Sequence, residues 1–270
     1  EADAIADVTS GIVTATITEN TAAALNSALV DSGSQVNAYD LTISAGSAAA
    51  TDLTSLDSKT SVAVNAAAVT EITGSATEVA AAYAANPTTG ITGLGNETVS
   101  ITGTTVATLA ELKAINNATS GTITLNTQSI NADYSGSVAD VKAAFNGITT
   151  QTGKITLTDS SVSVADINTV ATVTSGEVTA TVTSGAASVL KTLTTDSNDA
   201  ITMTVNAESS GATAAADLVS LNGNTNKAIT MTAVTKVSGS YADLLNVYVT
   251  NAGQYNGEGD EAVTITGTVS

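Results

Sequence analysis

The chain has 270 residues and a net charge of −18, with no cysteine, no histidine and only lysine among its seven basic residues. Without imidazole or thiol groups, the common zinc, copper, haem and iron–sulfur ligand sets and the Ser-His-Asp and Cys-His catalytic arrangements are excluded. The negative charge and the lack of arginine argue against nucleic-acid binding. Oxygen chemistry remains, in which carboxylates, hydroxyls and carbonyls hold hard cations such as Ca²⁺.

Hydrophobic residues make up 43% of the chain, but aromatic residues make up only 3%. This composition is too apolar for a disordered chain and predicts a core of aliphatic side chains. No apolar run approaches the eighteen or so residues that a membrane span requires, so we expect no membrane span. The sequence starts at Glu1 without a charged-then-apolar leader, which is typical of a processed or excised piece.

A short helical signature recurs along the chain: a small residue, an acid, an aliphatic residue, two spacers and a second aliphatic residue. Aliphatic residues spaced three apart form one apolar stripe on a helix. Copies with the acid lie at 51–56, 77–79, 110–115, 139–141, 165–170, 216–221 and 242–247, and copies without it lie near 24–25 and 187–189. The spacing of roughly 22 to 33 residues is typical of repeat proteins.

Alternating segments, in which aliphatic residues and threonines take turns, lie between these helices. Alternation with a period of two predicts strands with one apolar face, and threonine and β-branched aliphatic residues favour strands. The segments are 13–18, 41–44, 62–64, 99–102, 123–125, 155–158, 178–183, 201–205, 229–232 and 263–266.

Together the two signatures predict a β-solenoid of about ten coils, each with one parallel strand and a short helix. We expect residues 1–270 to form a single repeat domain that belongs to a longer array or assembly. The alternative is an α/β globular domain with a parallel sheet, which the short helices and the missing glycine-rich phosphate loop disfavour.

The acids of the helical signature have two interpretations. A carboxylate in the first turn interacts favourably with the helix N-terminus, and this local role is the simpler one. Stacked repeats would instead align the acids in a row of like charge that Ca²⁺ could bridge. The residues are Asp52, Glu78, Glu111, Asp140, Asp166, Asp217 and Asp243.

Two loops carry the densest acids and are candidate calcium sites. The first contains Asp196 and Asp199, and the second contains Glu258, Asp260 and Glu261. Both mix carboxylates with amides or glycines, as oxygen-ligand loops do, but neither matches an EF-hand. Since Asp, Asn and Gly are also ordinary turn residues, solvated turns are the competing interpretation. Ca²⁺ is the one cofactor that the sequence suggests.

The strand threonines also have two interpretations. Stacked in register, they resemble the flat threonine arrays of antifreeze solenoids, which would imply ice binding. Threonine is equally a favoured polar residue of exposed strand faces. The positions are Thr14, Thr16, Thr124, Thr156, Thr158, Thr179, Thr181, Thr202, Thr204, Thr230, Thr232, Thr264 and Thr266.

We predict no catalytic residues and no enzyme activity, because sugar-cleaving clefts carry aromatic platforms and this chain has six Tyr, one Phe and no Trp. The Ala/Thr/Val-rich sequence of residues 62–79 resembles repeats of very large secreted surface proteins of marine bacteria and cyanobacteria. The composition is similar to that of bacterial S-layer proteins. This resemblance implies a non-catalytic extracellular structural or adhesive role, often with Ca²⁺.

We therefore predict a secreted, self-assembling subunit of a surface layer, sheath or filament, whose partners are copies of itself. The alternatives are an adhesin stalk or phage fibre segment, and an ice-binding protein that uses Thr-x-Thr ladders. Open sheet edges pair with other chains unless they are covered, and head-to-tail contacts build open filaments.

Overall fold

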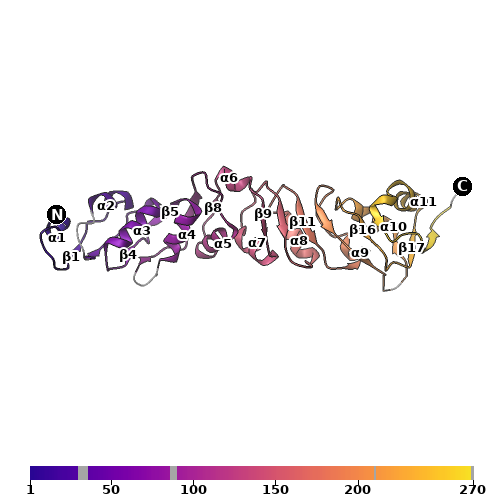
Figure 1. Ribbon diagram of the computed structural model, residues 1–270, viewed down its shortest axis with the longest axis horizontal. Helices are drawn as coiled ribbons and strands as arrows, with labels where there is room; N and C mark the ends of the chain where they lie inside the picture. The colour runs from indigo at the N-terminus through magenta and orange to yellow at the C-terminus, as the bar shows by residue number, and fades with distance from the viewer. Residues whose placement is uncertain (30–35, 86–89, 210, 269–270) are drawn as a thin grey trace. The chain divides into compact units, whose positions relative to one another are not determined.

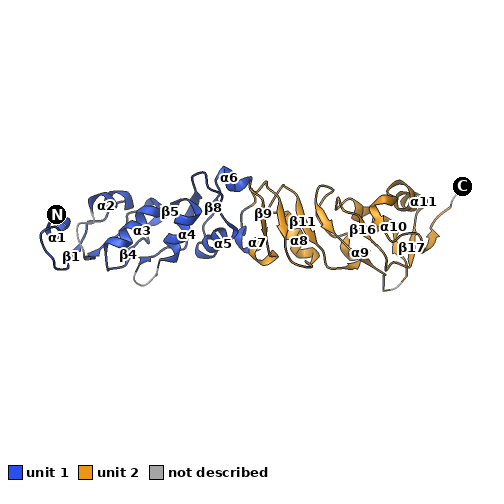
Figure 2. Cartoon of the chain, viewed as in Figure 1, with its two compact units in different colours: residues 1–131, 143–148 blue, residues 132–142, 149–270 orange. Residues whose placement is uncertain are grey.

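The computed structural model describes residues 1–29, 36–85, 90–209 and 211–268. The chain divides into two compact units, which Figure 2 shows in different colours. Unit 1 comprises Glu1–Asn131 and Ala143–Ile148, and unit 2 comprises Ala132–Lys142 and Thr149–Ser270. The single domain over 1–270 stays a prediction.

Eleven short α-helices lie in these residues, and the longest have ten residues (Figure 1). They are α1 (Ala2–Ala6), α2 (Ala22–Ala28), α3 (Ala50–Lys59), α4 (Ala76–Ala84), α5 (Leu109–Ala118), α6 (Thr127–Ile130), α7 (Val138–Ala144), α8 (Val164–Ala171), α9 (Ala187–Leu190), α10 (Ala215–Asn222) and α11 (Tyr241–Leu245). A π-helix, η1 (Asn246–Thr250), and a 3₁₀ turn, η2 (Ala252–Gln254), follow α11. All nine segments with the helical signature contain or overlap a helix.

Unit 1 contains three small sheets. Their strand orders are β1-β2, β3-β5-β7-β8 and β4-β6. The strands are β1 (Thr14–Thr16), β2 (Ala38–Asp40), β3 (Gly46–Ala49), β4 (Val64–Asn65), β5 (Val69–Gly74), β6 (Ile91–Thr92), β7 (Thr98–Ile101) and β8 (Ile123–Thr124).

Unit 2 contains four small sheets, with strand orders β13-β11-β10-β9, β12-β14, β15-β17-β19 and β16-β18. The strands are β9 (Tyr134–Gly136), β10 (Ile155–Leu157), β11 (Val178–Thr181), β12 (Gly185–Ala186), β13 (Ala200–Thr202), β14 (Val205–Asn206), β15 (Thr213–Ala214), β16 (Ile229–Thr230), β17 (Lys236–Gly239), β18 (Tyr255–Asn256) and β19 (Ala262–Ile265).

The predicted β-solenoid with one strand and one helix per coil is wrong. Within the described ranges the structure is a mixed α/β fold, with eleven helices and strands divided among seven small parallel sheets. Segments that the alternation did not reveal also form strands, among them β3 and β17, which contain small residues and glycine. The α/β class agrees with the globular alternative, but the strands are not gathered into one sheet.

All strand pairs in the described chain are parallel, and their partners are close in sequence. The separation runs from 20 residues for Gly185 and Val205 to 27 residues for Val64 and Ile91. Each parallel connection therefore has room for one turn and one short helix, which agrees with the spacing of the sequence signatures.

The helices form where the signature places their caps and apolar stripe. Ser75 with Glu78, and Thr108 with Glu111, form reciprocal capping boxes at the N-termini of α4 and α5. In four copies of the signature, both aliphatic positions face the core and are fully buried. The pairs are Leu53 and Leu56, Leu112 and Ile115, Ile167 and Val170, and Leu218 and Leu221.

Candidate functional site

A threonine turn that precedes a strand recurs in both units. In each case the threonine Oγ1 accepts a hydrogen bond from the N–H two residues later and donates one to a backbone carbonyl 21 to 24 residues earlier. All four threonines are buried, and they are Thr60, Thr119, Thr174 and Thr225. The turn thus joins each strand to the preceding one through a side chain with both of its hydrogen-bonding roles used.

Two of these turns have the sequence Thr-Ser-Gly, and the glycine allows a close approach of two backbones. A Cβ atom at Gly121 would lie 2.1 Å from the carbonyl oxygen of Glu97. A Cβ atom at Gly176 would lie 2.5 Å from the carbonyl oxygen of Thr152. Only a residue without a side chain fits such a contact.

Buried carboxylates stabilise two other turns of the sequence Gly-x-Glu. At 95–97, Glu97 accepts hydrogen bonds from the N–H groups of Gly95 and Asn96 at 2.8 and 3.1 Å, and from the hydroxyl of Tyr83. Burial and the contact with Glu97 raise the pKa of Tyr83 above its ordinary range. Neither Glu97 nor Tyr83 was a predicted site residue, although the recurrence of Gly-x-Glu at 95–97 and 259–261 was a signal in the sequence.

At 259–261 the same turn leaves some carboxylate oxygens without hydrogen bonds. Glu261 accepts hydrogen bonds from the N–H of Gly259 at 2.8 Å and from the hydroxyl of Tyr248 at 3.3 Å. Its other oxygen, Oε1, and Oε2 of Glu258 are both buried without a hydrogen-bond partner in the described structure. Burial, and secondarily the charge of Glu261, raise the pKa of Glu258. Burial and the Glu261 and Glu258 charges likewise raise the pKa of Tyr248.

The structure therefore brings together two of the three acids predicted in the second loop, Glu258 and Glu261. Asp260, between them in sequence, is exposed. Side-chain oxygen atoms that are buried, negatively charged and unpartnered are ligands that a hard cation could use. This pair is the candidate cation site, although no group of three or more acids that could hold a metal ion occurs among the described residues.

The first predicted loop is organised differently. Asp199 is buried, and its two oxygens accept hydrogen bonds from the N–H groups of Val178 at 2.6 Å and Asp196 at 2.8 Å. Asp196 is exposed and accepts a hydrogen bond from the N–H of Asn198 at 2.6 Å. Both residues line a surface pocket of about 260 Å³ with Thr174. These bonds give both carboxylates a turn-forming role of the kind that Asp commonly has.

The helix acids have partners that give the predicted row a local explanation. Asp166 and Asp217 form ion pairs with Lys142 at 2.6 Å and with Lys191 at 2.8 Å. The hydrogen bond from Lys142 lowers the pKa of Asp166. Because the side chains of Lys142 and Asp166 are 41% and 35% exposed, the ion pair contributes little to stability.

The strand threonines form short rows. Thr156 pairs with Thr179, but the next positions on either side are Ser135 and Ala200. At the other end of the chain, Thr14 and Thr16 pair with Ala38 and Asp40. No ladder among the described strands carries more than two consecutive threonines.

Replacing Glu258 by glutamine is expected to raise the melting temperature at pH 7 by about 1–2 °C, because it removes a partly buried charge and its repulsion from Glu261. The fold holds the pKa of Glu258 above its unfolded value, so the stabilising protonated form is lost as the pH rises through that raised pKa. The gain should accordingly vanish below about pH 4. Thermal melts of E258Q, with D260N as the exposed control, measure this. An equal gain for both variants at both pH values would contradict the buried pair.

None of the described helices has the length and apolar character needed to cross a membrane. No protein-family model matches the chain, and comparison with curated proteins and with solved structures found no significant similarity.

Proposed function

We propose that this chain is a non-catalytic structural protein of the cell surface or extracellular space, which assembles with copies of itself. The observation that carries the proposal is the exposed edge strand β19 of unit 2. It hydrogen-bonds to β17 on one side only, and its Val263 and Ile265 are 49% and 45% exposed. Open edges with apolar side chains are templates for pairing with another chain.

The first strand of unit 1 supports the same proposal. β1 pairs with β2 alone, and Ile12 beside it is 61% exposed. The proposed assembly adds a parallel strand to such an edge, a pairing that the chain already uses throughout both units. A contact between two different edges is heterologous and propagates to a filament or closes to a ring.

Calcium fits this proposal as a bridge between negative surfaces. The charge of −18 makes copies repel one another, and cations would screen or bridge that repulsion. We assign the candidate cation site to Glu258 and Glu261, where two buried oxygens have no hydrogen-bond partner in the described chain. The site lies in the turn that precedes the exposed β19.

The alternatives have less support. An adhesin stalk or phage fibre segment would use the same parallel strand pairs without lateral assembly, and no structural observation favours it over self-assembly. Ice binding requires long regular arrays of threonine, whereas the described ladders stop after two.

Electron microscopy of the purified protein with Ca²⁺ and with EDTA tests the proposal. We expect ordered filaments or sheets with Ca²⁺ and their dissociation in chelator. A monomer in both conditions, at the highest soluble concentration and at high salt, would show that the chain is not a self-assembling subunit. Ice shaping by the monomer would favour the ice-binding alternative.

A further inference from the structure

The sequence Thr-Ser-Gly occurs twice more. At Thr183-Ser184-Gly185 the N–H of Gly185 donates to the carbonyl of Thr204 instead. The other occurrence is Thr9-Ser10-Gly11, just before β1. The turn is already formed there, because the N–H of Gly11 donates a hydrogen bond to Thr9 Oγ1 at 3.1 Å. The matching distance is 3.0 Å at Gly121 and 2.9 Å at Gly176. The turn at 9–11 therefore has the internal geometry of the two buried copies.

What differs is the surface that the turn contacts. Thr119 Oγ1 donates to the carbonyl of Glu97 at 2.7 Å, and the N–H of Ser120 donates to the carbonyl of Gly95 at 2.9 Å. Thr9, Ser10 and Gly11 are all exposed, and the described chain offers their side chains no such strand. A Cβ at Gly11 would meet nothing closer than Thr9 Oγ1 at 3.5 Å, so nothing here requires a glycine.

The helix before this turn has the same character. In the buried copies the residue four positions before the threonine is a fully buried aliphatic, such as Ile115 or Val170. The equivalent residue at the N-terminus is Ile5, which is 58% exposed. Helix α1 has no buried residue.

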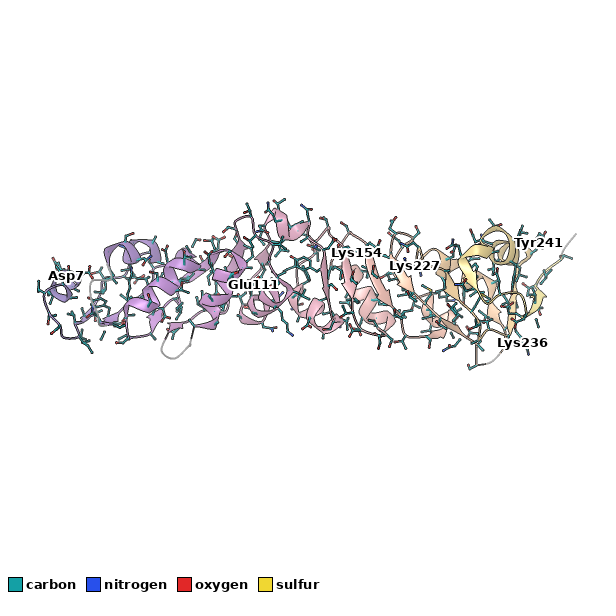
Figure 3. The ribbon with its side chains drawn as sticks, viewed as in Figure 1. Asp7, Glu111, Lys154, Lys227, Lys236 and Tyr241 are labelled. Atoms are coloured by element: carbon teal, nitrogen blue, oxygen red, sulfur yellow. The ribbon has the colours of Figure 1, made fainter. Side chains whose placement is uncertain are left out.

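A matching uncovered surface lies in unit 2, at the turn before β19. The turn Gly259-Asp260-Glu261 has the Gly-x-Glu sequence of 95–97, and its glutamate makes the same bonds to a glycine N–H and a tyrosine hydroxyl. At 95–97 the Thr-Ser-Gly turn 119–121 covers the backbone, whereas no described residue covers 259–261 in this way. In the same unit, Tyr241 (labelled in Figure 3), Leu245 and Val249 are exposed on α11 and η1.

We propose that the turn Thr9-Ser10-Gly11 of one copy docks on the turn Gly259-Asp260-Glu261 of a second copy, so that β1 adds in parallel to β19. This inference rests on the proposed self-assembly and names its contact. The occupant is a second copy because the chain itself contains both halves of a contact that it forms internally between 95–97 and 119–121.

The internal contact also sets the register. Val99, two residues after Glu97, pairs with Ile123, which lies four residues after Thr119. The same offsets pair Val263 with Val13. The backbone hydrogen bonds of β19 agree with this register. Ala262 donates its N–H to the carbonyl of Thr235 and Thr266 donates its N–H to the carbonyl of Gly239, so the N–H and C=O of Val263 face the open side of the strand.

Charge sets the condition for docking. Asp7, labelled in Figure 3, and Asp3 precede the docking turn, while Glu258, Asp260 and Glu261 surround the receiving turn. These like charges would face one another, so association should strengthen with salt and with Ca²⁺.

Cysteine cross-linking tests the register directly, because the chain has no cysteine of its own. A mixture of V13C and V263C proteins should form a disulfide-linked heterodimer under mild oxidation with Ca²⁺. A mixture of T14C and V263C should form roughly tenfold less, since a shift of one residue points the side chain to the opposite face. Equal yields from the two mixtures would overturn the register.

Gly11→Val tests the contact itself, because the added side chain would meet the second copy, whereas within its own chain its Cβ has only an ordinary van der Waals contact with Thr9 Oγ1. Sedimentation should show association weakened roughly tenfold or more, with an unchanged melting temperature. Gly253→Val is the control, since Gly253 is also exposed and has nothing within 4 Å of its Cβ position. If the wild type assembles and G11V assembles equally well, this contact is wrong while the proposed function stands. If the wild type never associates, both are wrong.

Discussion

Replacement of Gly121 by alanine is expected to lower the free energy of unfolding by about 3 kcal/mol. The added Cβ would lie 2.1 Å from the carbonyl oxygen and 2.5 Å from the carbonyl carbon of Glu97. Both are backbone atoms, which cannot rotate away as the end of a side chain can. Relief of the clash must separate the turn from Glu97 and weaken the bonds of Thr119 and Ser120.

Urea denaturation followed by circular dichroism measures this loss. Gly11→Ala is the matched control, because it makes the same change in the same Thr-Ser-Gly turn where no backbone approaches. We expect G11A to change the free energy of unfolding by less than about 0.5 kcal/mol. Similar losses in the two variants would mean that the close approach at Gly121 is not the cause.

Replacement of Glu97 by alanine is expected to destabilise the protein by about 3–5 kcal/mol. The Glu97 side chain is 2% exposed and is the acceptor for the N–H groups of Gly95 and Asn96 and for the Tyr83 hydroxyl. Alanine removes the acceptor and leaves buried donors without partners. It also leaves a void where the carboxylate lay against Tyr83.

Glutamine at position 97 separates hydrogen bonding from charge. Its carbonyl oxygen can still accept from the two N–H groups, and the tyrosine hydroxyl can turn to accept from its amide. We therefore expect E97Q to lose less than half of what E97A loses in thermal and urea unfolding. Asp260→Ala, at an exposed carboxylate, should change little. Equal losses in E97A and D260A would contradict a structural role for Glu97.

Local elements were predictable from the sequence because their signals are local. The segment at 110–115 carries an acid in its first turn and aliphatic residues three apart, and α5 forms there with a capping box and buried Leu112 and Ile115. The alternation at 155–158 likewise marks β10. Strands such as β3 and β17 escaped detection because they are short, rich in small residues, and held by pairing with strands more than 20 residues away.

The candidate site was predictable only in part. The acids of the second loop stood out by their density, and Glu258 and Glu261 do lie together with buried, unpartnered oxygens. The density at 196–199 gave the same signal, yet there Asp199 bonds the backbone of Val178 and Asp196. Identical residue types thus have different environments, because burial and the position of neighbouring N–H groups depend on the fold.

Composition, charge and the two periodic signatures determined, by themselves, that the core is aliphatic, that short helices and strands alternate, and that imidazole and thiol chemistry is excluded. Only the tertiary structure decided that the strands divide into several small sheets. It also decided that the turns of Gly121 and Glu97 pack against each other, whereas the turns of Gly11 and Glu261 have the same sequences but no other turn packed on them in the described chain. The physical reason is that the same short turn sequence can be buried or exposed, because its burial depends on whether another strand of the fold lies against it.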